Sequence, residues 1–198
     1  MHAQLVRIRW LVLSLVFCAA NSVMAARYGP LIYTSSGTSI TITDCASSAT
    51  GALEIPDTID GLPVIAIGDR AFYNCRQLTA VTVPQGISSI GRWAFQYCES
   101  LVDFAIPVGV TSIGDYTFHS CTSLENVVIP AGIISIGNYA FQSCSSIENV
   151  VIPEGVGSIG TSAFQSCSSL TDLVIGAGAK TIGNYAFQTY GALANVTM

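Results

Sequence analysis

The stretch Ser135–Cys144 reads SIGNYAFQSC, and Ser158–Cys167 reads SIGTSAFQSC, which differs from it at only two positions. The Ile-Gly pair of this phrase recurs six times, each 23 residues after the last, beginning at Ile67. Phenylalanine keeps the same period from Phe72 to Phe187, and leucine or isoleucine keeps it from Leu78 to Leu193. Because several residue classes share one period, the sequence predicts a repeated structural unit that buries its apolar face by stacking on its neighbours.

The segment LENVVIP, which begins at Leu124, predicts a short strand. Leu124, Val127 and Ile129 would point into a core, whereas Asn126 and Val128 would point outward. The proline at the end lacks a backbone donor and would stop the strand. The pattern recurs in every repeat, so these strands would stack in parallel. An aliphatic strand of this kind at a period of roughly 20 to 29 residues indicates a leucine-rich repeat.

The rest of each unit returns the chain to the opposite side of the core. In AGIISIG, Ile133 and Ile136 would face inward, and Gly137 would permit a backbone turn that a side chain would hinder. The next position holds Asp or Asn in four of six repeats, and both are good helix N-caps. YAFQSC would then form a short helical turn that buries Phe141. The predicted fold class is a leucine-rich repeat solenoid, α/β but mostly β, in which 23-residue repeats combine a parallel β-strand stack with short helical turns.

The first 25 residues predict a signal peptide. Arg7 and Arg9 precede an apolar run from Trp10 to Ala20, and small residues follow near Ala25. The run is shorter than the roughly 20 residues that a membrane-spanning helix needs. We therefore expect no membrane span in the mature chain.

The remaining chain divides into two parts. Residues 26–50 predict an N-terminal β-hairpin cap that reverses at Ser35-Ser36-Gly37. Residues 51–198 hold about six repeats of the solenoid. Their last strand carries no polar cap, so we expect an uncapped C-terminal end and end-to-end self-association through it.

Charge limits the classes of partner. Only 10% of the residues are charged, well below the roughly 25% of an ordinary soluble domain. Removal of residues 1–25 would leave five basic and twelve acidic residues, a formal charge of −7. Such a surface repels phosphate groups, and the sequence has no Lys/Arg cluster. We therefore expect no nucleic acid partner.

The cysteines allow three interpretations. Cys45 and five cysteines at the repeat period make an even number, which in an exported protein favours disulfides. Stacked side chains would point the same way rather than toward each other, which favours buried reduced thiols. Zinc is disfavoured because no Cys-x-x-Cys occurs. We expect no metal and no cofactor. The five periodic residues are called the ladder cysteines below: Cys75, Cys98, Cys121, Cys144 and Cys167.

The sequence offers little for catalysis. His119 is the only histidine outside residues 1–25, and we expect it to face solvent. No nucleophile with an assisting histidine can be assembled around it. The carboxylates lie on different repeats, with no pair positioned for acid and base catalysis. We therefore expect that the protein is not an enzyme.

The repeat IPEGVGSIGTSAFQSCSSLTDLV, Ile152 to Val174, resembles the BspA-like leucine-rich repeat family of bacterial and some protist surface proteins. The resemblance covers nearly all of residues 28–198. It implies a secreted or cell-surface protein without catalytic activity, some relatives being adhesins for host matrix proteins. In a bacterium the periplasm is the alternative location. A structural spacer within a longer surface protein is the alternative function.

The outward positions of the strands form the candidate partner-binding site. The position between two inward aliphatics would align as an apolar stripe, with a polar row beside it and two glutamates beyond. The ligand would be a protein or a glycan, held on the strand face as in other repeat proteins. The candidate residues are Asp103, Ala105, Glu125, Asn126, Val128, Glu148, Asn149, Val151, Asp172 and Val174.

Overall fold

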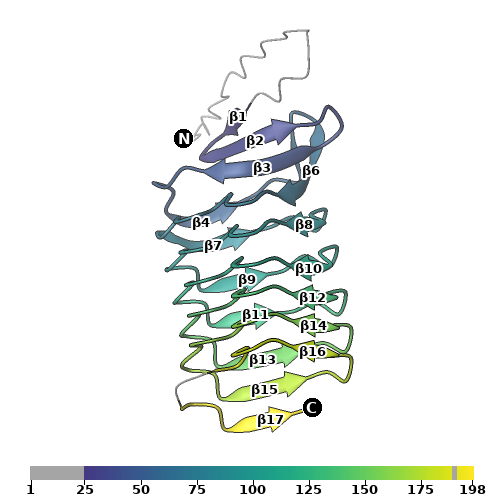
Figure 1. Cartoon of the computed structure of the whole chain (residues 1–198). Helices are drawn as coiled ribbons and strands as arrows, with labels where there is room; N and C mark the ends of the chain where they lie inside the picture. The colour runs from purple at the N-terminus through teal and green to yellow at the C-terminus, as the bar shows by residue number, and fades with distance from the viewer. Residues whose placement is uncertain (1–24, 189–190) are drawn as a thin grey trace, which may run out of the picture.

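Seven strands, one from each turn, stack in parallel along one side of the molecule (Figure 1). The computed structural model describes residues 25–188 and 191–198; the predicted signal peptide lies outside these residues apart from Ala25. The strands form two sheets, in the orders β11-β9-β7-β4 and β13-β15-β17. Their bounds are β4 Gly51–Glu54, β7 Leu78–Thr82, β9 Asp103–Ala105, β11 Asn126–Val128, β13 Asn149–Ile152, β15 Asp172–Ile175 and β17 Asn195–Thr197.

A second set of strands stacks on another side of the molecule. The order β10-β12-β14-β16 is parallel, and β8 pairs in parallel with β6 at the start of the stack. Each of these strands carries the isoleucine of the Ile-Gly pair, which is buried in β6 through β14. Their bounds are β6 Leu62–Ile67, β8 Ser89–Ile90, β10 Ser112–Ile113, β12 Ser135–Ile136, β14 Ser158–Ile159 and β16 Thr181–Ile182.

An antiparallel hairpin precedes the repeats, as the sequence predicts. Strands β2 (Leu31–Ser35) and β3 (Ile40–Cys45) pair on either side of a turn in which Gly37 has a φ of 88°. Strand β1 (Ala26–Tyr28) adds to the edge of β2, and β3 pairs in parallel with β6. The short strand β5 (Thr58–Ile59) pairs with β6 across Asp60 and Gly61. This arrangement joins the antiparallel cap to the parallel stack.

The expectation of a short helical turn in YAFQSC is wrong. The described residues contain no helix, so none of them could cross a membrane as one, and residues 138–143 form successive turns. Tyr139 and Ser143 adopt left-handed backbone angles, with φ of 58° and 61°. Backbone N–H groups of Tyr139 and Phe141 donate to the carbonyls of Thr161 and Ala163 in the next repeat, at 2.9 and 2.7 Å. Because these donors bond between repeats, they are not free for bonds within a helix.

In three repeats, the Asp or Asn after the glycine also bonds to the next repeat rather than capping a helix. The Oδ1 atoms of Asp69, Asp115 and Asn138 accept hydrogen bonds from backbone N–H groups one repeat ahead, each at 2.8 Å. Their partners are Arg92, Asn138 and Thr161. The preference for Asp and Asn at this position therefore reflects contact with a neighbour 23 residues away.

The core is a column of stacked phenylalanines. Phe118, Phe141 and Phe164 are buried, and consecutive rings lie 5.2 and 4.9 Å apart at interplanar angles of 7° and 10°. The column extends to Phe72 at one end and to Phe187 at the other. Aliphatic residues of both strand sets surround it, including Leu124, Val127, Ile129, Ile133 and Ile136, all buried as predicted.

In four of the six Ile-Gly pairs, the glycine is required by close packing between repeats rather than by a left-handed turn. A Cβ atom built at Gly137 would lie 2.6 Å from the backbone nitrogen of Asp115, and one at Gly160 would lie 2.5 Å from that of Asn138. Real Cβ atoms do not approach backbone so closely, so a side chain here would push the repeats apart.

Candidate functional site

The ten predicted site residues lie on or immediately before the strands of one face. In the register of β9 and β11, Asp103 is beside Asn126 and Ala105 is beside Val128. In the register of β13 and β15, Asn149 is beside Asp172 and Val151 is beside Val174. Glu125 and Glu148 precede β11 and β13. The repeat period therefore brings together residues that are up to 71 positions apart in the chain.

The outward middle positions form an apolar stripe. Val128 is 73% exposed, Val151 is 60% exposed and Val174 is 41% exposed. Ala105 continues the stripe toward the hairpin, and Thr82 ends it there. Adjacent exposed valines on a single face make a contiguous apolar patch, which monomeric proteins usually keep small.

The polar row beside the stripe is held by hydrogen bonds between strands. The side-chain amide of Asn126 donates to Oδ1 of Asp103 at 3.0 Å, and that of Asn195 donates to Oδ1 of Asp172 at 2.6 Å. The Thr171 hydroxyl also donates to Asp172, at 2.7 Å. The hydrogen bonds from Asn195 and Thr171 lower the pKa of the Asp172 carboxyl. This row therefore presents fixed acceptor oxygens to solvent.

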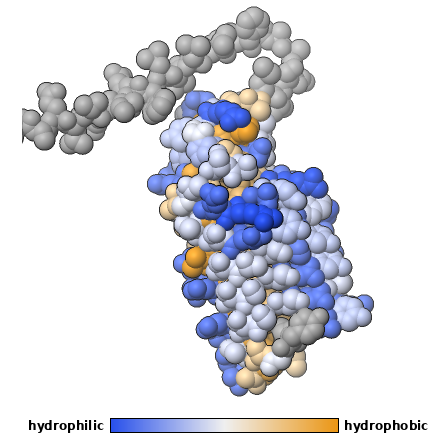
Figure 2. Space-filling view, turned by 90° about the vertical axis from the view of Figure 1, so that its left-hand side faces the viewer, coloured by the Kyte–Doolittle hydropathy of each residue, from blue (hydrophilic) through white to orange (hydrophobic). Residues whose placement is uncertain are grey.

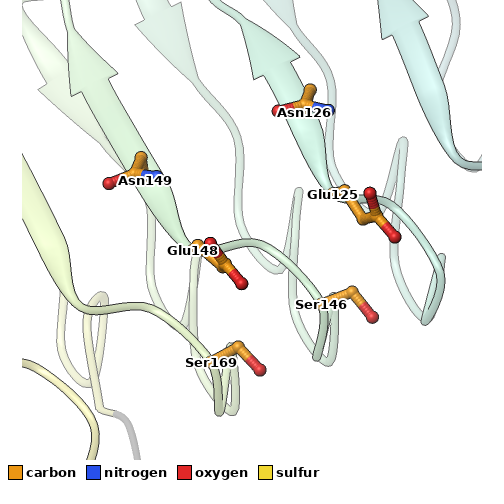
Figure 3. Close-up of a pocket in the computed structure, with 6 residues that line it drawn as sticks. All are labelled: Glu125, Asn126, Ser146, Glu148, Asn149 and Ser169. Carbon is orange, nitrogen blue, oxygen red and sulfur yellow. The ribbon is translucent and has the colours of Figure 1, made fainter.

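A polar hollow of about 250 Å³ lies beside the row (Figure 3). Glu125 and Glu148 enter it from the starts of neighbouring strands and point to the same side, while Ser146 and Ser169 reach it from the turns before β13 and β15. Asn126 and Asn149 complete its lining. The sequence analysis did not assign these two serines to the candidate site. The signal that could have revealed their role is the serine that recurs three residues before the start of β9, β11, β13 and β15.

The hollow coincides with an interruption of the strand face. Strand pairing runs from β4 to β11 and from β13 to β17, and among the described residues no pairing joins β11 to β13. The repeat positions before and after it are bonded: the N–H of Glu125 donates to Val102 O at 3.0 Å, and that of Thr171 donates to Glu148 O at 2.9 Å. The corresponding bond from Glu148 to Glu125 is missing. We call this break, between Glu125 and Glu148, the seam.

Four of the five ladder cysteines are core residues with protonated thiols. Cys98, Cys121, Cys144 and Cys167 are free and buried, and each thiol donates to the carbonyl of a phenylalanine 26 residues earlier, at 3.1 to 3.2 Å. Burial raises the pKa of each of these thiols, that of Cys167 to about 12. A protonated thiol is a poor nucleophile, so these four cysteines serve packing.

The side of the stack that carries the turns holds aromatic residues that sequence reasoning missed. Trp93, Tyr116 and Tyr139 stack in succession, with ring centroids 6.1 and 4.7 Å apart, and the Arg70 guanidinium lies 5.0 Å from the Trp93 ring. Their rings cover one another's faces, which leaves mainly edges to solvent. Figure 2 shows the side that lies on the left of Figure 1, where separate orange areas lie among pale and blue residues. The signal was an aromatic residue recurring two positions after the glycine.

The expectation that His119 faces solvent is wrong. The ring is half-buried, with its edge between Tyr97 and Tyr116 at centroid distances of 5.5 and 5.6 Å. Its Nδ1 atom is buried without a hydrogen-bond partner, and burial lowers the pKa of the ring. No serine, cysteine or carboxylate is bonded to it in the described part of the chain, so the geometry does not assemble a catalytic group around it.

A second hollow, of about 390 Å³, runs across β12, β14 and β16. It is lined by Ser, Thr, Ile and Asn side chains and by the glycines of three repeats, without an ionisable side chain. Within residues 25–188 and 191–198, no three His, Cys, Asp or Glu side chains cluster in a way that would hold a metal ion. The strand face with its polar hollow is therefore the strongest candidate site.

Comparison with known proteins places the chain in a family. Residues 65–196 match the BspA type leucine rich repeat region in six copies. No curated protein matches the chain significantly. The fold is similar to that of the T. pallidum leucine-rich repeat protein TpLRR, with 30% identity, a TM-score of 0.71, and coverage of 81% of this chain and 82% of that one.

Two further solved structures are similar to the chain. A leucine rich cell surface protein from Faecalibacterium prausnitzii matches with 28% identity and a TM-score of 0.74, over 90% of this chain and 55% of that one. A leucine-rich repeat protein from Bacteroides ovatus matches with 27% identity and a TM-score of 0.69, over 82% of this chain and 50% of that one. The chain thus spans about half the length of these two proteins. With six copies of the repeat matched over two thirds of its length, the chain belongs to the BspA-type leucine-rich repeat family.

Proposed function

We propose that the protein is a non-catalytic interaction module that binds another protein through its strand face, outside the cell or at its surface. The observation that carries this proposal is the run of exposed valines Val128, Val151 and Val174, bordered by acidic and amide side chains. A solvent-exposed aliphatic stripe with a polar rim is the pattern of a protein-binding surface. The cell-surface description of the Faecalibacterium prausnitzii relative supports the location.

A glycan ligand is less well supported than a protein. The hydroxyl and amide groups of the hollow suit sugar hydroxyls, but the outward strand positions of the described repeats hold no aromatic ring on which a sugar could stack. The apolar stripe would have no role in such a complex. A protein partner uses both features.

A structural spacer within a longer surface protein is the second candidate. It is favoured by the lengths of two solved relatives, of which this chain spans 55% and 50%. A spacer needs no exposed apolar stripe. Binding of a partner through the valines would therefore favour the interaction module over the spacer.

The test is a double substitution on the stripe, Val128→Lys with Val151→Lys. A matched control is Val108→Lys with Ile134→Lys, because Val108 and Ile134 are 73% and 62% exposed but lie outside the long strands. Proteins captured from the surfaces of candidate partner cells would be identified and titrated against all three forms. We expect the stripe variant to lose binding and the control to keep it. Equal binding by both variants would refute the assignment of the strand face.

A further inference from the structure

The charges of the strand face have one sign. Its outward positions and the residues that precede the strands include Glu54, Asp103, Glu125, Glu148 and Asp172, without a lysine or arginine in the described repeats. The two ion pairs of the described residues lie elsewhere, joining Arg76 to Glu99 at 3.3 Å and Arg92 to Asp115 at 3.7 Å. The acids of the strand face therefore have no internal counter-charge. A partner surface of opposite sign would be attracted along the whole face.

The seam is the one place on the face where two acids occupy the same position in neighbouring repeats. The residues at this position in successive repeats are Thr79, Val102, Glu125, Glu148, Thr171 and Ala194. Like charges on adjacent strands destabilise their pairing. The interruption of pairing falls between the two glutamates, which agrees with repulsion between their carboxylates. A cation between them would remove this repulsion, so the seam itself favours a basic group.

The hollow at the seam matches the head group of an arginine or lysine. Glu125 and Glu148 line the same hollow and point to the same side, so one guanidinium fork placed there can contact both carboxylates. Carbonyl and hydroxyl oxygens of Asn126, Asn149 and Ser146 lie around the same space and accept further hydrogen bonds. Val128 and Val151 lie farther along the same strands, where they would contact aliphatic side chains of the partner.

We infer that the strand face binds a basic, aliphatic protein segment, with one arginine or lysine seated in the hollow between Glu125 and Glu148. This inference rests on the proposed function and narrows it to one class of partner. The same charges disfavour sulfated or sialylated glycans, nucleic acids and anionic membranes. The partner is therefore defined by positive charge beside an apolar contact.

The inference can be tested with a display library of random 16-residue peptides, selected on the immobilised protein at low and at physiological salt. We expect the enriched peptides to combine arginine or lysine with Val, Leu or Ile. Enriched peptides would be synthesised and titrated against Glu125→Gln and Glu148→Gln, with Glu154→Gln as the control because Glu154 is exposed but off the face. We expect each seam variant to weaken binding by about threefold and the control to leave it unchanged.

A second measurement reports on the seam directly. Binding of an enriched peptide should let β11 and β13 pair, so the backbone amide of Glu148 should exchange its hydrogen more slowly. Amides at the already bonded positions Glu125 and Thr171 serve as internal controls. A peptide that bound elsewhere would leave the Glu148 amide unchanged.

The outcomes separate this inference from the proposed function. Neutral or acidic enriched peptides that still lose binding in Val128→Lys with Val151→Lys would overturn the partner chemistry and keep the strand face. Enriched peptides that bind the double variant as tightly as the wild type would overturn both the partner chemistry and the strand-face site. Enrichment no greater than on a blank surface would also overturn the inference, because it requires affinity for a short basic segment.

Discussion

Replacing Phe141 with alanine tests whether the stacked rings hold the repeats together. The ring is fully buried between Phe118 and Phe164, with centroids 5.2 and 4.9 Å away. Removing a buried phenylalanine ring costs about 3 to 5 kcal/mol because the void fills only partly. Two stacked neighbours also lose an aromatic contact, so we expect about 4 to 5 kcal/mol for Phe141→Ala.

The assay is urea unfolding followed by circular dichroism, in which the midpoint should fall at an unchanged slope. Phe187→Ala is the matched control, because Phe187 is only half-buried and stacks on Phe164 alone among the described residues, at 5.4 Å. We expect it to cost about 1 to 2 kcal/mol. Phe141→Leu keeps most of the volume and should cost less than Phe141→Ala. Equal losses for the two alanine variants, or a loss below about 1 kcal/mol for Phe141→Ala, would refute the stacking argument.

Three other predictions follow from the thiols, the seam and the histidine. Burial raises the pKa of the four ladder cysteines from Cys98 to Cys167. Their protonated thiols therefore contribute fully to the free energy of unfolding below the pKa of the unfolded thiols, near 9, and this contribution is lost as pH rises. Stability should fall by about 5 kcal/mol per pH unit above pH 9, and Cys144→Ala should reduce this slope by about a quarter in denaturation series. Glu148→Gln should stabilise the fold by about 0.2 to 1 kcal/mol while weakening basic peptides, whereas Glu154→Gln should do neither. The lowered pKa of His119 means that the folded ring resists protonation, so the wild-type protein should lose stability below about pH 6.5. His119→Gln should not show this loss, and identical melting curves at about pH 5 for variant and wild type would contradict the prediction.

The stack of strands could be predicted because its determinants repeat in the sequence. Leu124, Val127 and Ile129 face inward and Val128 faces outward, as the period requires. The turn at YAFQSC was predicted as helical because small and polar residues after Asp or Asn fit a helix start equally well. Hydrogen bonds to the next repeat decide the outcome, and these depend on contacts 23 residues away.

The candidate site could be predicted in part. A common period places Val128 beside its neighbours and Glu125 one repeat from Glu148, so the composition of the face follows from the sequence. The seam does not, because the repeat pattern is the same on both sides of it and predicts continuous pairing, whereas β11 and β13 do not pair. The hollow at the seam, which Ser146 and Ser169 help to line, follows only from the three-dimensional arrangement of the turns and strands. That this face binds a partner stays a prediction.

The close contact at Gly137 and Gly160 has a consequence for how such a chain can change. Each glycine packs against the backbone of the preceding repeat, and backbone is the same whatever side chains that repeat carries. A copied or deleted repeat would therefore meet a surface that already fits it, and the stack could lengthen or shorten by whole units without a redesigned junction. Outward residues such as Val128 and Glu148 take no part in this contact. The number of repeats and the character of the binding face can therefore vary independently.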